Sequence, residues 1–257
     1  MNIIINTFAG LLIPFLGTSL GAAGVFFLKR EIGSRAVQIL NGFSAGVMTA
    51  ASVWSLLIPA IEECENLGMI SFLPAAIGTW LGVIFLSLIE HLPSDLTERG
   101  AGDLSEDSSL LSFAVTIHNI PEGMAVGIVY AGVIFGGDEV ALAGAFALSI
   151  GIAIQNIPEG AIISMPLFAR GKSKPRSFAA GVLSGAVEPI AGALAVLAAS
   201  VILPAMPYFL GFAAGAMIYV VVAEMIPEVH ADGNGLYGTI SFAFGFTVMM
   251  CLDVALG

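Results

Sequence analysis

The sequence predicts an all-α integral membrane protein whose helices form one bundle in the lipid bilayer. Of the 257 residues, 58% are apolar and only 11% are charged, whereas soluble domains carry about 25% charged residues. The apolar residues are gathered into long segments, and a membrane-spanning helix needs roughly 20 of them. Two of these segments also share the sequence Asn-Ile-Pro-Glu-Gly. A polar motif repeated inside apolar segments indicates a site enclosed by the bundle.

The apolar residues form eight segments, each long enough to cross a bilayer. We predict helices rather than strands, because a barrel would show short alternating segments. The connections are too short for a separate soluble domain, so residues 1–257 are expected to form a single transmembrane domain. The first segment lacks the basic start of a signal peptide and continues to Leu28, so we interpret it as the first span. The predicted spans are 3–28, 36–61, 69–91, 109–136, 139–169, 177–202, 206–227 and 236–256.

The basic residues predict the orientation of the chain in a cell (inner) membrane. All eight lie in alternate connections, which the positive-inside rule places in the cytoplasm, so that both termini lie outside. The opposite connections carry acidic residues and no basic ones, and such a mouth would concentrate cations. Ordinary exclusion of basic residues from the outer face explains the same pattern equally well. The basic residues are Lys29, Arg30, Arg35, Arg99, Arg170, Lys172, Lys174 and Arg176; the outer acids are Glu62, Glu63, Glu65, Asp138 and Glu139.

Two internal repeats join spans that run in opposite directions. Asn-Ile-Pro-Glu-Gly occurs at 119–123 and again at 156–160. A weaker repeat matches residues 42–48 to residues 211–217, and an Ile-Pro pair follows each copy. Chance similarity among small apolar residues is the alternative for this second repeat. Inverted repeats are typical of transporters whose substrate site lies near the bilayer midplane.

Carboxylates inside the predicted spans are the main indication of a cation site. Glu122, Glu159, Glu188 and Glu224 lie well within spans that contain no Lys or Arg. A charge at the bilayer centre costs at least about 2.5–3.5 kcal/mol on insertion scales. The compensating positive charge must therefore come from protons or from a bound cation. The net charge of −11 also argues against a nucleic-acid partner.

The residues around these carboxylates suit a transition metal. His118 and Glu122 are one helical turn apart, and Gln155 and Glu159 repeat that spacing. Asn119 and Asn156 stand three residues before each Glu, and the prolines at 121 and 158 free a carbonyl one turn earlier. A mixed set of imidazole, amide and carboxylate favours Zn²⁺ and similar ions over Mg²⁺ or Ca²⁺. Met48 adds a thioether if it faces the site; a core-filling role is the alternative for Met48, and a structural proline kink with a protonated Glu for one motif alone.

The paired motifs resemble the signature of the ZIP (Zrt-, Irt-like protein) metal transporters, and Gln155 together with Glu188-Pro189 resembles the GufA-like prokaryotic branch. The resemblance implies a 3+2+3 helix bundle, often dimeric, with metal bound between the spans at 109–136 and 139–169. It also implies one or two metal positions. The first would use His118, Glu122, Gln155 and Glu159 with Met48 nearby; the second would use Asn119, Asn156 and Glu188, with Glu122 and Glu159 bridging.

These observations predict transport of divalent transition-metal cations into the cytoplasm, with Zn²⁺ as the first candidate and Fe²⁺, Mn²⁺, Cd²⁺ and Co²⁺ as further candidates. The metal is the cargo, and no catalytic cofactor is expected. The main alternative is an intramembrane metalloenzyme, although the sequence has no His-Glu-x-x-His motif. A third hypothesis is a carrier of organic solutes. The lack of an intramembrane basic residue to hold an anion argues against it.

Overall fold

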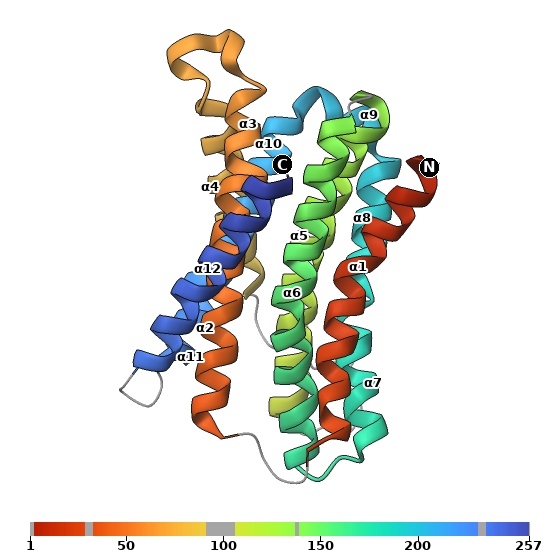
Figure 1. The fold of residues 1–257 in the computed structure, drawn as a ribbon, viewed down its shortest axis with the longest axis vertical. Coiled ribbons are helices and arrows are strands. Elements are labelled where there is room, and N and C mark those ends of the chain that lie inside the picture. Colours follow the sequence, from red (N-terminus) through yellow and green to blue (C-terminus); the bar gives the residue numbers. More distant parts are fainter. Residues whose placement is uncertain (1–2, 29–32, 91–105, 137–138, 231–234, 257) are drawn as a thin grey trace.

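The computed structural model describes residues 3–28, 33–90, 106–136, 139–230 and 235–256, which form helices and no strand (Figure 1). The side chains at 90, 106–118, 136, 139–141 and 256 lie outside this description. The α-helices are α1 Ile3–Ala23, α2 Ser34–Ala51, α3 Ile58–Glu62, α4 Leu73–Glu90, α5 Glu106–Gly136, α6 Glu139–Ala169, α7 Lys174–Gly185, α8 Val187–Leu197, α9 Ala199–Ile202, α10 Met206–Val220, α11 Ile226–Val229 and α12 Leu236–Leu256.

The helices agree closely with the predicted apolar segments. Among the described residues, six helical stretches are long and apolar enough to cross a membrane, and two shorter apolar helices cover Leu73–Ile89 and Asn119–Phe135. The second of these is the part of α5 with described side chains, and α5 itself is 31 residues long. The fold is thus that of an integral membrane protein, and the count of eight spans stays a prediction.

The predicted spans at 36–61 and 206–227 each contain a π-helical turn directly before their Ile-Pro pair. The turn η2, Ser52–Leu57, separates α2 from α3, and η7, Val221–Met225, separates α10 from α11. Pro59 and Pro227 are the second residues of the helices that follow. Because proline has no N–H to donate to the preceding turn, the backbone there adopts a wider hydrogen-bonding pattern.

Pro121 and Pro158 lie within continuous helices, whereas Pro189 follows an interruption. Helices α5 and α6 continue through Pro121 and Pro158, so these prolines do not end their helices. The span predicted at 177–202 is interrupted at Ala186, where α7 ends and α8 begins. Pro189 cannot donate to the carbonyl of Gly185, four residues earlier, so one helical hydrogen bond is missing at this interruption.

Four close helix pairs make up the bundle: α1 with α6, α5 with α8, α2 with α12, and α4 with α10. The last two pairs are packed alike. A Cβ on Gly46 of α2 would clash with the carbonyl oxygen of Phe242, and a Cβ on Gly215 of α10 would clash with that of Thr79. Gly42 and Gly211 make the corresponding approaches one turn earlier. The match between residues 42–48 and 211–217 therefore has a structural counterpart, which argues against chance similarity.

The two ends of the bundle differ in charge. Helix ends that carry described basic residues, at Arg35, Arg170 and Lys174, lie opposite the end where the chain starts and finishes (Figure 1). Lys174 Nζ donates to the carbonyl oxygens of Phe26 and Leu28 at 2.9 and 2.8 Å, which ties α7 to the end of the first span.

Cys64 and Cys251 are both free.

Candidate metal site

The two copies of the repeated motif face each other in the middle of the bundle. Glu122 of α5 is fully buried, and Gln155 of α6 donates from Nε2 to its Oε1 at 2.9 Å. Gln155 is itself fully buried and occupies the motif position that His118 occupies in α5. The first metal position inferred from the sequence thus has two of its proposed members in direct contact.

A third helix brings Glu188 to the same region. Glu188 begins the first turn of α8 and is 1% exposed. Its Oε1 accepts a hydrogen bond of 2.7 Å from the hydroxyl of Thr18 on α1. The charge of Glu188 interacts with those of Glu122 and Glu159, and Asn156 lies beside Glu188 and Glu122. Residues from α1, α5, α6 and α8 therefore meet around one polar centre.

The asparagines of the two motifs are both buried. Asn119 donates from Nδ2 to the carbonyl oxygen of Ser184 at 3.0 Å. That carbonyl lies just before the interruption at Ala186, so Asn119 holds the backbone of the last turn of α7. Asn156 shows no hydrogen-bond partner for either of its amide atoms within the described part of the chain. The amide oxygens of both asparagines are therefore open to a ligand.

Several oxygen atoms in this centre have no hydrogen-bond partner among the described residues. A buried polar atom without a partner costs about 1–3 kcal/mol, and more when it is charged, and few are tolerated in folded proteins. Such a concentration of acceptors, with no basic side chain in these spans, is expected of a site that binds cations or protons. The atoms are Asn119 Oδ1, Glu122 Oε2, Gln155 Oε1, Asn156 Oδ1, Glu159 Oε2 and Glu188 Oε2.

The acidic residues continue from this centre towards the end that carries the basic residues. Glu159 is half-buried, and its charge interacts with that of Glu122 on one side and Glu224 of η7 on the other. Glu224 in turn interacts with Glu228 of α11, which accepts a hydrogen bond from the buried Asn41 of α2. The carboxylates thus lead from the buried centre along η7 and α11.

Two of the residues proposed from the sequence are not joined to the centre by any described contact. The side chain of His118 lies outside the described residues. Met48 of α2 is buried in the apolar core, one turn beyond Ser44. Within the described part of the chain, no three His, Cys, Asp or Glu side chains lie close enough together to hold a metal ion. Any site built from the described residues must therefore draw on the amide oxygens as well as the carboxylates.

Two hydroxyl residues of the centre were not identified from the sequence. Thr18 contacts Glu188, and the hydroxyl of Ser44 on α2 donates to the carbonyl oxygen of Gln155 at 2.6 Å. Each lies in an apolar span next to a run of small residues, where a hydroxyl ordinarily bonds to its own helix. A polar side chain midway along a span, beside glycines that allow close approach, was the available signal.

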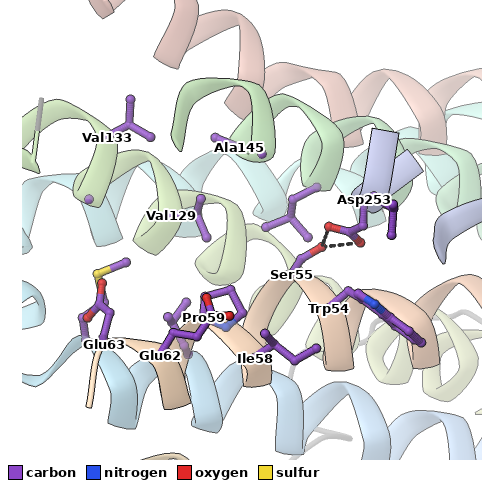
Figure 2. A pocket seen from close by; sticks show the side chains of 16 residues that line it. Trp54, Ser55, Ile58, Pro59, Glu62, Glu63, Val129, Val133, Ala145 and Asp253 are labelled. Atoms are coloured by element: carbon purple, nitrogen blue, oxygen red, sulfur yellow. Dashed lines mark hydrogen bonds between the residues drawn. The ribbon is translucent and has the colours of Figure 1, made fainter. Parts of the chain in front are cut away.

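A pocket of about 590 Å³ opens at the end of the bundle that carries the termini. It lies between η2 and α3 on one side and α5 and α6 on the other, and α10 and α12 complete its mainly apolar walls (Figure 2). Glu62 and Glu63 line it, and the hydroxyl of Ser55 lies 2.8 Å from each carboxylate oxygen of Asp253, so that its one proton is shared between them. Partial desolvation raises the pKa of Glu63 from its ordinary value of 4.5. Two of the predicted outer acids thus border a real opening, whereas the side chains of Asp138 and Glu139 lie outside the described residues.

The comparisons with known proteins identify zinc transporters as relatives of this chain. Residues 105–253 match the family model described as ZIP Zinc transporter. The chain is 37% identical to zinc transporter ZIP11 of Xenopus tropicalis, over 99% of this chain and 98% of that protein. It is 35% identical to zinc transporter GufA of Myxococcus xanthus, over 97% of this chain and 99% of that protein. It is also 35% identical to zinc transporter ZIPB of Bordetella bronchiseptica, over 95% of this chain and 79% of that protein.

The resemblance found in the repeated motifs is therefore confirmed, including its GufA-like character. These relatives are named as transporters rather than enzymes, which removes the metalloenzyme alternative. Together with the long apolar helices, they make the chain a multi-pass membrane protein. The chain belongs to the ZIP family of zinc transporters.

Proposed function

We propose that this protein carries divalent transition-metal cations, Zn²⁺ foremost, into the cytoplasm through a site between α5 and α6. The observation that carries the proposal is the buried Glu122–Glu188 pair, whose second carboxylate oxygens lack hydrogen-bond partners among the described residues. Two carboxylates that cannot be paired with Lys or Arg need a cation or protons. Membership of a zinc transporter family favours the cation.

The proposed ligands divide by chemistry. Glu122, Glu159 and Glu188 supply negative charge through Oε2, and Gln155, Asn119 and Asn156 supply neutral amide oxygens. His118 and Met48 would add the softer nitrogen and sulfur donors that favour Zn²⁺ over Mg²⁺ and Ca²⁺. Glu224 would receive the ion as it leaves towards the inner end. The proposal is that this set binds one or two ions, with Fe²⁺, Mn²⁺, Cd²⁺ and Co²⁺ as further candidates.

The proposed orientation gives the direction of transport. With eight spans in a 3+2+3 bundle and both termini outside the cell membrane, the basic end of the molecule faces the cytoplasm. Each unit of charge gains about 2.3 kcal/mol per 100 mV, so a dication gains about 4.6 kcal/mol on entering a negative interior. That energy supports roughly thousandfold accumulation without ATP. Association of two copies into a homodimer is part of the same prediction.

Uptake of radioactive Zn²⁺ into proteoliposomes, with and without an inside-negative potential, tests the proposal. We expect uptake by the wild type that the potential accelerates, no uptake by Glu122→Ala, and wild-type uptake by Glu65→Ala, a matched change at an exposed acid outside the site. Folded wild-type protein that binds Zn²⁺ but carries none would contradict transport. Uptake by Glu122→Ala at the wild-type rate would contradict the location of the site.

A further inference from the structure

The packing of α1 on α6 repeats the packing of α8 on α5. A Cβ on Gly123, the last residue of the first Asn-Ile-Pro-Glu-Gly motif, would clash with the carbonyl oxygen of Glu188. A Cβ on Gly160, the last residue of the second motif, would clash with the carbonyl oxygen of Thr18. Because Gly123 and Gly160 are equivalent in the repeat, Thr18 of α1 occupies the place that Glu188 occupies on α8.

The two equivalent residues are also in direct contact. The Thr18 hydroxyl donates to Glu188 Oε1 at 2.7 Å, and neither side chain is more than 1% exposed. Gly185 leaves the room for this contact, because a Cβ there would lie 2.8 Å from Thr18 Cβ and 3.0 Å from Glu188 Oε1. The next nearest acceptor of the hydroxyl, the carbonyl oxygen of Pro14, is 3.5 Å away. A hydroxyl has one proton to donate, and the shorter contact with the carboxylate takes it.

This contact determines which oxygen of Glu188 can serve the site. The oxygen Oε1 is engaged by Thr18, whereas Oε2 is buried and has no partner among the described residues. Threonine suits the task because its branched Cβ restricts χ1, so the hydroxyl keeps its direction. On the other side of the centre, Gln155 engages Glu122 Oε1 in the same way and leaves Glu122 Oε2 unpaired.

We propose that Thr18 is a positioning residue for metal binding, which holds Glu188 by Oε1 so that Oε2 faces the cation. The proposal rests on the function proposed above. It makes α1 part of the site although α1 contributes no ligand. It also assigns a role to the inverted repeat, because one copy supplies the ligand and the equivalent position of the other copy supplies its support.

Zn²⁺ uptake by proteoliposomes and equilibrium Zn²⁺ binding by the purified protein test the proposal in Thr18→Val, which removes the hydroxyl at nearly constant shape, and Thr18→Ser, which keeps it. We expect Thr18→Val to raise KM and Kd roughly tenfold, the effect of losing one hydrogen bond to a charged group, with little change in maximal rate. Thr18→Ser should stay within about twofold of the wild type. Thr7→Val is the matched control, because Thr7 is a buried threonine of α1 whose hydroxyl has no hydrogen-bond partner among the described residues.

Repeating the substitution in the Glu188→Ala variant shows whether Thr18 acts by positioning Glu188 or only by packing in the core. In Glu188→Ala, the further change Thr18→Val should leave KM and Kd unchanged, because its partner is gone. A wild-type KM in Thr18→Val, failure of Thr18→Ser to restore binding, or an equal effect of Thr18→Val in both backgrounds would overturn the proposal alone. Wild-type protein that neither binds nor carries Zn²⁺ would overturn the proposed function and this proposal with it. If Thr18→Val does not fold, Thr18→Ala is measured in its place against the same controls.

Discussion

Glycine contacts bring helices close together in both halves of the bundle, the half formed by α2, α4, α10 and α12 and the half formed by α1, α5, α6 and α8, but only the second half contains the candidate site. In the pairs α2–α12 and α4–α10, which we call the apolar half, glycines such as Gly46 and Gly215 let the helices approach closely, and neither of the buried carboxylates Glu122 and Glu188 belongs to these helices. In the pairs α1–α6 and α5–α8, Gly123 and Gly160 do the same, but the helices they join enclose Glu122 and Glu188. Close packing alone therefore serves folding in the bilayer, where small residues let helices approach. The candidate cation site lies where buried carboxylates stand beside these close glycine contacts.

Removing the carboxylates should have the largest effect on activity and a small one on folding. We expect Glu122→Ala and Glu159→Ala each to abolish high-affinity Zn²⁺ binding, a loss of at least about 100-fold, because charged ligands are removed from a site that water does not easily replace. Isothermal titration calorimetry on purified protein measures it. Unchanged affinity in both variants would show that the two halves do not differ as described.

Filling a glycine contact in the apolar half should instead damage folding. Gly215→Ala places a methyl group against the carbonyl oxygen of Thr79, and overpacking of this kind costs about 1–3 kcal/mol. We expect a lower melting temperature and less monodisperse protein in detergent. Gly33→Ala is the control, because no atom lies within 4 Å of a Cβ there and its φ of −71° suits alanine. Equal melting temperatures for the two variants would disprove the tight contact.

The sequence predicted where the helices of the apolar half lie, but not their pairing or their π-helical turns, and the candidate site stays a prediction. Span positions follow from hydropathy, so the predicted 236–256 coincides with α12 and the predicted 36–61 lies within the helical stretch Ser34–Glu62. Glu122 and Gln155, which helical spacing and repetition singled out in the sequence, are in contact through a hydrogen bond. The support from Thr18 was missed, because it depends on which helix packs beside α8. Spacing along one chain holds no information on that choice.

The imidazole of the first motif should influence metal preference more than overall uptake. We expect His118→Ala to weaken Zn²⁺ binding by about tenfold and Mn²⁺ binding less, because imidazole discriminates in favour of Zn²⁺. Competition between the two metals in the uptake assay gives the ratio directly. Gln155→His, which makes the two motifs alike, should shift the ratio the other way. Equal losses for both metals in His118→Ala would remove this residue from the basis of selectivity.

The smallest effect is expected at the outer pocket, where acids border an apolar opening instead of forming a centre. Replacing both Glu62 and Glu63 by Gln should slow uptake at low metal concentration by about two- to fivefold without changing Zn²⁺ affinity at equilibrium, because the pair only raises the local cation concentration. The difference should vanish at high ionic strength, where screening removes the attraction. Because the pKa of Glu63 is raised, its charge is lost at a higher pH than that of an ordinary carboxyl group. The slowing of wild-type uptake by mild external acid should therefore be weaker in Glu63→Gln. A rate defect that persists in high salt would instead show that Glu62 and Glu63 are ligands. The outer pocket would then bind the metal itself, as the buried centre is proposed to do.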